Sequence, residues 1–171
     1  MRLGERLSPL GDRHPLFAYV VYMHYRKHSM TTSRQLVDNC ACTRVRTAAR
    51  LMTRAYDEAL RPCGLSAAQL AILAAVDVGE ATSIAELSKR LAMDRTTLSR
   101  NLRPLEKAGW IRLGAEGWKR SKTVHVTIEG RQRLARATAL WETAQASFLK
   151  RFGKAEWTRV ERDLQAISAL Y

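Results

Sequence analysis

The chain has 171 residues, of which 46% are hydrophobic, and a formal net charge of +13 from 29 basic and 16 acidic residues. The apolar content excludes a fully disordered chain, and the length allows one domain with a sizeable core or a small domain plus an extension. The excess of positive charge favours a polyanionic partner, either nucleic acid or an acidic membrane surface.

The number of cysteines and the hydropathy pattern limit the class of protein further. An odd number of cysteines with a C-x-C spacing (Cys40, Cys42, Cys63) does not suggest a disulfide scaffold, so we expect a reducing cytoplasm. No further ligands follow at zinc-site spacing, and we expect no metal and no cofactor. No apolar run approaches the ~20 residues that span a bilayer, and residues 16–23 lack the cleavage site of a signal peptide.

The first half of the chain predicts an extension followed by three helices. Residues 1–34 have no clear period and are interpreted as an N-terminal extension. A helical apolar period over residues 39–60 ends before Pro62 and Gly64. Two capping boxes, at residues 66–69 and 83–86, then predict the starts of helices over residues 66–77 and 83–91.

Residues 94–107 predict a helix with two unlike faces. Asp94 is a good N-cap, and the helix should end near residue 109. At 100° per residue, one side carries three leucines (Leu98, Leu102, Leu105), and the opposite side carries hydroxyls and cations (Thr96, Arg100, Arg103, Lys107). Pro104 removes one helical hydrogen bond and should bend the helix or end it early.

The second half predicts a β-hairpin and two long helices. Residues 110–113 and the alternating residues 123–128 predict two strands, the second with Val124, Val126 and Ile128 on one face. Helices follow at residues 129–152 and 156–170, both with an apolar stripe. The fold class is therefore mainly α with a small β-hairpin wing. It consists of a winged helix-turn-helix at residues 63–128 and terminal dimerisation helices at residues 39–60 and 129–170, which together form a domain over residues 35–171. In a monomer the stripes of the terminal helices would stay exposed, and a second copy would cover them.

The charge is concentrated where the helix-turn-helix and the hairpin are expected. Between residues 89 and 125 ten basic residues stand against three acidic ones. Cations and hydroxyls on a helix suit a DNA major groove, and an arginine at a hairpin tip suits a narrow minor groove. The candidate DNA-binding residues are Arg95, Thr96, Thr97, Ser99, Arg100, Arg103, Lys119, Arg120 and Lys122. The alternatives are a solvated basic face, a salt bridge for Arg95, helix capping for Thr97, and a charged loop at the hairpin tip.

The order of elements and two stretches of sequence resemble the MarR family of bacterial transcriptional regulators. The stretches are residues 87–111 (LSKRLAMDRTTLSRNLRPLEKAGWI) and residues 120–130 (RSKTVHVTIEG). The resemblance covers about residues 39–170. It implies a homodimer in which each subunit places its recognition helix in a major groove and its wing in the neighbouring minor groove. It also implies that small ligands or oxidation adjust the spacing of the two DNA-reading lobes.

The wing departs from the family pattern at one position. Where the family commonly has Asp-x-Arg, this chain has Trp118-Lys119-Arg120, so the arginine is kept and the acid is replaced. The family acid helps to position the wing, which leaves the wing geometry of this chain open. The resemblance favours a DNA contact for Arg120 alone among the three cations at the tip.

Several residues could regulate the protein. Cys40 and Cys42 lie near the start of the first dimerisation helix, where the resemblance suggests oxidant sensing and where small packed side chains are the simpler interpretation. Tyr56 and Trp141 could line an effector pocket between the dimerisation helices and the DNA-reading lobe, although core packing is the simpler interpretation. No nucleophile elbow, metalloprotease motif or glycine-rich phosphate loop is present, so we expect no enzyme.

We therefore expect a cytoplasmic, homodimeric, sequence-specific DNA-binding regulator that recognises a pseudo-palindromic operator in double-stranded DNA. It should act as a repressor that a small-molecule effector or oxidation releases, without a membrane partner. The first alternative is a non-specific nucleic-acid-binding architectural protein. The second is a membrane or protein adaptor that uses the basic face.

Overall fold

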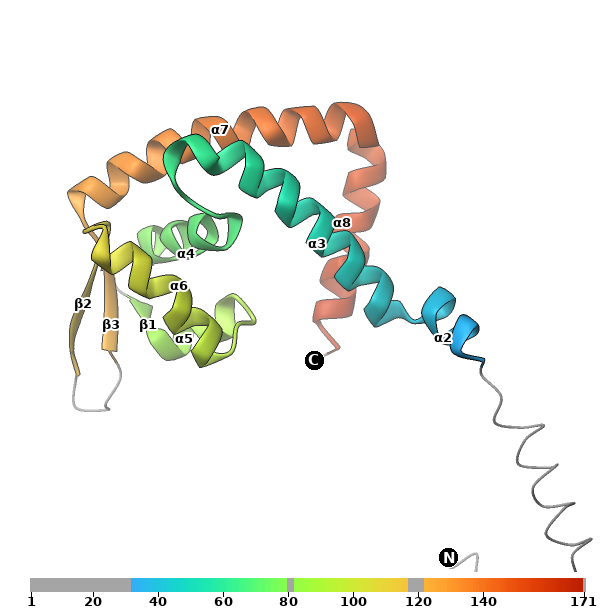
Figure 1. The fold of residues 1–171 in the computed structure, drawn as a ribbon, viewed down its shortest axis with the longest axis horizontal. Helices are drawn as coiled ribbons and strands as arrows, with labels where there is room; N and C mark the ends of the chain where they lie inside the picture. Colours follow the sequence, from blue (N-terminus) through green and yellow to red (C-terminus); the bar gives the residue numbers. More distant parts are fainter. Residues whose placement is uncertain (1–31, 80–81, 117–121, 171) are drawn as a thin grey trace, which may run out of the picture. The chain divides into compact units, whose positions relative to one another are not determined.

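A computed structural model describes residues 32–79, 82–116 and 122–170, so residues 1–31 of the expected extension lie outside the described residues. The chain divides into two units, residues 1–48 and residues 49–171. In chain order the elements are α2 (Ser33–Asn39), α3 (Ala41–Leu60), the 3-10 helix η1 (Arg61–Cys63), α4 (Ala67–Val78), β1 (Thr82–Ser83), α5 (Ile84–Arg90), α6 (Arg95–Lys107), β2 (Ile111–Glu116), β3 (Lys122–Val126), α7 (Ile128–Phe152) and α8 (Lys154–Ser168) (Figure 1).

The first unit contains α2 and the beginning of α3. A capping box between Thr32 and Gln35 starts α2, which the sequence pattern had not predicted. Cys40 ends α2, and its carbonyl oxygen accepts a hydrogen bond of 3.0 Å from the backbone N–H of Arg44 in α3. Cys40 is therefore the residue at which one helix stops and the next begins.

Local side-chain caps start α4 and α5 where the sequence predicts them. Ser66 with Gln69, and Ser83 with Glu86, form complete capping boxes at α4 and α5. Gly64 follows η1 with a φ of +66°, a left-handed conformation that glycine adopts without strain. These caps satisfy backbone N–H groups that a helix start leaves without partners.

Pro104 lies inside α6 and does not end it, because the helix continues to Lys107. The three leucines of α6 are buried, as the pattern predicts, and anchor the helix to the core. Proline costs α6 one backbone hydrogen bond, while the leucine contacts on both sides of it hold the helix against the core.

The hairpin is part of a three-stranded antiparallel sheet of order β1-β3-β2. The two residues of β1 pair with Val124 and Thr123 of β3, a strand that the sequence pattern had not predicted. The expectation that Ile128 continues the second strand is wrong: it is the first residue of α7 and is 70% exposed. The hydroxyl of Thr127 accepts a hydrogen bond from the N–H of Gly130, and this cap ends the strand and starts the helix.

The core of the second unit lies between α4, α5, α6, the sheet and the first half of α7. Contacts of α4 with α5, α6, α7 and β3 place α4 at its centre, and Figure 1 shows these elements gathered beside the strands. The largest fully buried side chains are Leu60, Ile72, Leu73, Val76, Leu87, Leu98, Leu105 and Val124. This core fixes the orientation of α6 and of the strands, on which the candidate site depends.

Within the described ranges no single helix has both the length and the apolar character for a membrane span, although one bent pair, residues 41–63 with α4, passes the same test of length and composition.

Candidate nucleic-acid interface

The turn between α5 and α6 sets the direction of α6. Ala92 has a φ of +48°, the only positive φ of a non-glycine residue in the described part of the chain. The N–H of Met93 donates to the carbonyl of Ser88 at 3.0 Å, and the half-buried Met93 packs against the core. Asp94 then accepts a hydrogen bond of 2.8 Å from the N–H of Thr97 and starts α6. Two short helices joined by a tight turn are the arrangement of a helix-turn-helix.

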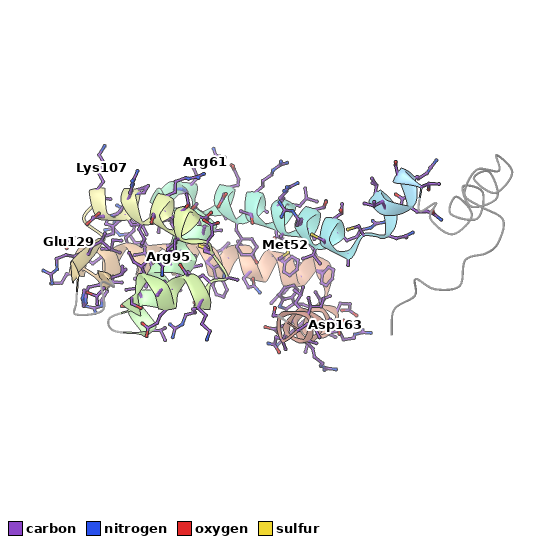
Figure 2. The ribbon with its side chains drawn as sticks, turned by 90° about the horizontal axis from the view of Figure 1, so that it is seen from below. Met52, Arg61, Arg95, Lys107, Glu129 and Asp163 are labelled. Carbon is purple, nitrogen blue, oxygen red and sulfur yellow. The ribbon has the colours of Figure 1, made fainter. Side chains whose placement is uncertain are left out.

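One face of α6 gathers five of the predicted DNA-binding residues around a shallow depression of about 300 Å³. They are Arg95, Thr96, Ser99, Arg100 and Arg103. Ser99 is half-buried and the other four are exposed, while the leucines on the opposite side are buried. Figure 2 labels Arg95 and Lys107, the first and last residues of this helix. The face can offer guanidinium groups and hydroxyls to phosphates or to base edges.

The arginines of this face are not neutralised within the described part of the protein. No ion pair described there includes Arg95, Arg100 or Arg103. Asp94 is the nearest acid in sequence, and hydrogen bonds from Thr97 lower the pKa of its carboxyl group. The carboxylate is thus bound by the helix N-terminus and forms no ion pair with Arg95, Arg100 or Arg103.

Thr97 has a different environment from Thr96 and Ser99. Its hydroxyl donates to Asp94 Oδ2 at 2.6 Å, and its carbonyl accepts a hydrogen bond of 2.9 Å from Asn101. The structure thus places Thr97 in the cap of α6, which was the alternative interpretation of its sequence position. A DNA contact by Thr97 stays a prediction.

The wing is described at its base and not at its tip. Lys122 opens β3, while Lys119 and Arg120 lie outside the described residues, as does Trp118. The pairing of β2 with β3 shifts register between Leu113 and Glu116, the mark of a bulge.

Contacts that the sequence did not predict fasten the base of the wing to α7. The hydroxyl of Thr127 donates to the carbonyl of Gly109 at 2.7 Å. Arg133 lies 4.6 Å from the centroid of the Trp110 ring and donates to the carbonyl of Cys63 at 3.0 Å. These contacts join residues far apart in the sequence, and no local pattern could have indicated them. The Thr-x-x-Gly at residues 127–130 indicated only the start of α7, where the N–H of Gly130 donates to the Thr127 hydroxyl.

A second cavity lies beside the core, between α3, α4 and α7. It has a volume of about 370 Å³ and is lined by Tyr56, Leu60, Ala67, Leu70, Ala71, Ala74, Leu134, Thr138 and Trp141. Tyr56 and Trp141, which the sequence left between core packing and an effector pocket, both line it. The hydroxyl of Tyr56 donates to Oε1 of Gln145, and burial raises the pKa of its phenol.

The three cysteines have different environments. Cys63 is buried and its thiol donates to the carbonyl of Leu60 at 3.0 Å, whereas Cys42 is exposed. Hydrogen bonds from Thr43 lower the pKa of the Cys40 thiol. Among the described residues, no group of three side chains could hold a metal ion.

Comparisons with known proteins agree on one class. A model of the MarR family matches residues 64–121. A crystal structure of the M. tuberculosis transcriptional regulator MosR matches at 38% identity with a TM-score of 0.69, covering 78% of this chain and 96% of that one. MosR in complex with DNA matches at 38% identity and a TM-score of 0.68, covering 77% and 98%.

A more distant structure shares the fold. It is Bordetella bronchiseptica BpsR, whose DNA binding is regulated by 6-hydroxynicotinic acid. It matches at 20% identity with a TM-score of 0.68, covering 77% of this chain and 95% of that one. No curated protein sequence matches the chain significantly.

Proposed function

The chain belongs to the MarR family of DNA-binding transcriptional regulators, and from this we propose that it binds a pseudo-palindromic operator as a homodimer and represses transcription by covering the promoter. The observation that carries the proposal is the face of α6: exposed arginines without acidic partners in the described residues, backed by three buried leucines. MosR, at 38% identity, has been crystallised with DNA. Such a regulator acts in the cytoplasm and needs no catalytic chemistry.

In the proposed complex α6 enters the major groove. Arg100 and Arg103 pair with guanine or with phosphates, since a bidentate arginine–guanine contact supplies about 1–3 kcal/mol of discrimination. Arg95, Thr96 and Ser99 contact the backbone and adjacent bases, because they surround the same depression. Arg120 enters the minor groove, with Lys119 and Lys122 beside it on phosphates.

The proposed homodimer rests on apolar residues left uncovered on α3, α7 and α8. Leu51 is 59% exposed, Phe152 46% and Ile167 46%. A groove of about 670 Å³ runs between α3 and α7, lined in part by Met52 and Phe148. A second copy would cover these surfaces and would set two α6 helices about one turn of DNA apart.

We further propose that a small molecule or oxidation releases the operator. BpsR, which shares the fold, responds to 6-hydroxynicotinic acid. The apolar cavity beside Tyr56 is the candidate effector site. Cys40 is the candidate oxidation site, with Cys42 as its exposed neighbour, because the lowered pKa of the Cys40 thiol favours the reactive thiolate.

The proposed DNA-binding residues can be tested with Arg100→Ala combined with Arg120→Ala. Removal of these two guanidinium groups should weaken operator binding by about 2 kcal/mol or more, roughly thirtyfold, in a gel-shift series. The salt dependence of binding should also become shallower, by about 0.9 for each phosphate that the variant no longer neutralises.

Arg136→Ala combined with Lys150→Ala is the matched control, since both residues are exposed on α7 and their replacement removes the same two positive charges. It should leave operator affinity and salt dependence near those of the parent. Parent-like affinity in the double variant would show that the DNA-binding residues are misassigned. Equal affinity for operator and scrambled DNA would instead favour the non-specific architectural protein.

A further inference from the structure

Arg133 is a cation of α7 whose partners are uncharged groups outside that helix. Its guanidinium carbon lies 4.6 Å from the centroid of the Trp110 ring, and one of its N–H groups donates to the carbonyl of Cys63 in η1 at 3.0 Å. The side chain is half-buried, and none of the ion pairs among the described residues includes it. The contacts of Arg133 therefore join α7 to Trp110 and to η1.

Trp110 lies where α6, the wing and α7 meet. Its N–H donates to the carbonyl of Leu105 in α6 at 2.9 Å, and its carbonyl accepts a hydrogen bond of 3.1 Å from the N–H of Thr127, the N-cap of α7. The strand β2 begins at the next residue. The ring also reaches the turn after η1, since a β-carbon at Gly64 would lie 3.9 Å from Cη2 of Trp110. A displacement of Trp110 would therefore move the end of α6 and the base of the wing.

The elements on the two sides of Trp110 have different tasks in the proposed dimer. The helix α6 carries the arginine face, whereas α7 carries part of the apolar surface that a second copy would cover. The main contacts of α6 are with α4, α5 and β2. Its orientation toward α7 therefore depends on α4, which also packs on α7, and on the connection through Trp110.

We propose that Arg133 is a positioning residue for operator recognition. It holds the Trp110 ring against α7 and η1, fixes the angle between α7 and the DNA-reading elements, and so sets the half-site separation that the dimer accepts. This rests on the proposed function, because only a dimer reads a half-site separation. Each added base pair moves a half-site by about 3.4 Å along the duplex and turns it by about 35°, so the preferred separation reports the placement of the two α6 helices.

Gel shifts with operators that differ only in the number of base pairs between the half-sites test the proposal. The parent should bind one separation best and lose about tenfold or more in affinity when one base pair is inserted or removed. Arg133→Met keeps a long side chain without the charge and the N–H donors, and it should reduce this loss to about threefold or less. Equal weakening at every separation, or a preference as sharp as that of the parent, would overturn the proposal.

Arg136→Met is the matched control for charge. Arg136 is exposed on the same helix and takes part in no ion pair among the described residues, so this variant should keep the preference of the parent. A preference reduced as much as in Arg133→Met would show that the loss of charge, and not the contact with Trp110, is responsible.

Trp110→Leu removes the partner of Arg133 without a change in net charge, and it should reduce the preference as Arg133→Met does. The double variant should be no worse than either single variant, because all three lose the same interaction. If Trp110→Leu does not fold, Trp110→Phe replaces it, and its smaller aromatic face should give an intermediate preference. Additive effects of the two substitutions would contradict the assignment.

Hydrogen exchange of the protein without DNA separates failure of this proposal from failure of the proposed function. In Arg133→Met the backbone N–H groups of Trp110 and Thr127 should exchange about tenfold or more faster than in the parent, while that of the buried Leu73 should not change. Unchanged exchange at Trp110 and Thr127 would overturn the proposal alone. A parent that binds a single half-site as tightly as the paired operator would overturn the proposed dimeric binding, and faster exchange would still support the connection through Arg133.

Discussion

At the scale of single residues, hydrogen bonds to neighbouring residues decide which charged and polar side chains remain free to bind another molecule. Asp94 lies directly beside the arginine face, yet its carboxylate accepts hydrogen bonds from both the backbone and the hydroxyl of Thr97. It therefore caps α6 rather than pairing with Arg95. The same contacts bind the hydroxyl of Thr97, while Thr96, one residue earlier, remains exposed.

Cys40 allows a prediction about reactivity and pH. Because hydrogen bonds from Thr43 lower the pKa of the Cys40 thiol, a larger share of it is thiolate at neutral pH than in an ordinary cysteine. Thr43→Val removes the side-chain hydrogen bond, so the pKa should rise and alkylation by iodoacetamide at pH of about 7 should slow by severalfold. Tandem mass spectrometry of samples taken between about pH 6 and pH 9 resolves the rate at Cys40.

Cysteine variants test whether oxidation of the Cys40 thiol releases operator DNA. Peroxide should release operator DNA from the parent and should not release it from Cys40→Ser. From Cys42→Ser, peroxide should release operator DNA to the same extent as from the parent or to a smaller extent. Release from Cys40→Ser at the parent's peroxide concentration would remove Cys40 from the proposed response.

At the scale of elements, the sequence predicted those parts that local chemistry controls. The capping boxes of α4 and α5 and the two faces of α6 depend on residues within a few positions of one another. These three helices could therefore be placed to within a few residues. The helical period of 100° per residue also predicted the arginine face of α6, and the burial of the three leucines on the opposite side confirms that period.

The features that the sequence did not predict depend on distant partners. The two-residue strand β1 exists only because β3, some forty residues later, pairs with it. No sequence pattern singled out Arg133, whose partners Trp110 and Cys63 lie far from it in the chain. Ile128 alternated with Val124 and Val126, but the capping hydroxyl of Thr127 outweighed the alternation.

Gly130 supports a prediction about the junction of the wing and α7. A β-carbon at this position would collide with the carbonyl oxygen of Trp110, which accepts a hydrogen bond of 3.1 Å from the N–H of Thr127. Gly130→Ala should therefore lower the free energy of unfolding by about 1–3 kcal/mol in urea titrations, although alanine normally favours a helix.

Gln132→Ala is the control for this change, because Gln132 is exposed on the same helix and should alter stability by no more than about 0.5 kcal/mol. If Gly130→Ala unfolded at the same urea concentration as the parent, the backbone at residue 130 could shift without loss of stability. The junction of the wing and α7 would then not fix the wing.

At the scale of the whole molecule, the terminal helices leave large apolar residues exposed. Phe148 stacks on Phe152 with centroids 5.4 Å apart and meets Trp157 edge-on at 5.2 Å. This aromatic cluster joins α7 to α8, while Phe152 still exposes 46% of its surface. The proposed second copy would complete the burial.

A charge in this surface should separate the subunits. Phe152→Glu should raise the dimer dissociation constant by about thirtyfold or more in sedimentation experiments, because a carboxylate would be buried in an apolar interface. Operator affinity should fall with it. Leu51→Glu provides an independent variant on α3.

Ala146→Glu adds the same charge to an exposed position of α7 that does not line the groove, and it should remain dimeric. A dimer as stable as the parent in both Phe152→Glu and Leu51→Glu would place the interface elsewhere on the molecule.

The length of α7 has a consequence for signalling within one subunit. Its 25 residues begin at the base of the wing, pass the cavity wall at Leu134 and Thr138, and end at Phe152. At 1.5 Å per residue this rod is roughly 37 Å long, so a tilt of only about 3° moves one end by roughly 2 Å relative to the other. The cavity wall at Leu134 and Thr138 lies only roughly 9–15 Å from the wing end of this rod, so a tilt about that wall would move the distant Phe152 end by more than the wing end.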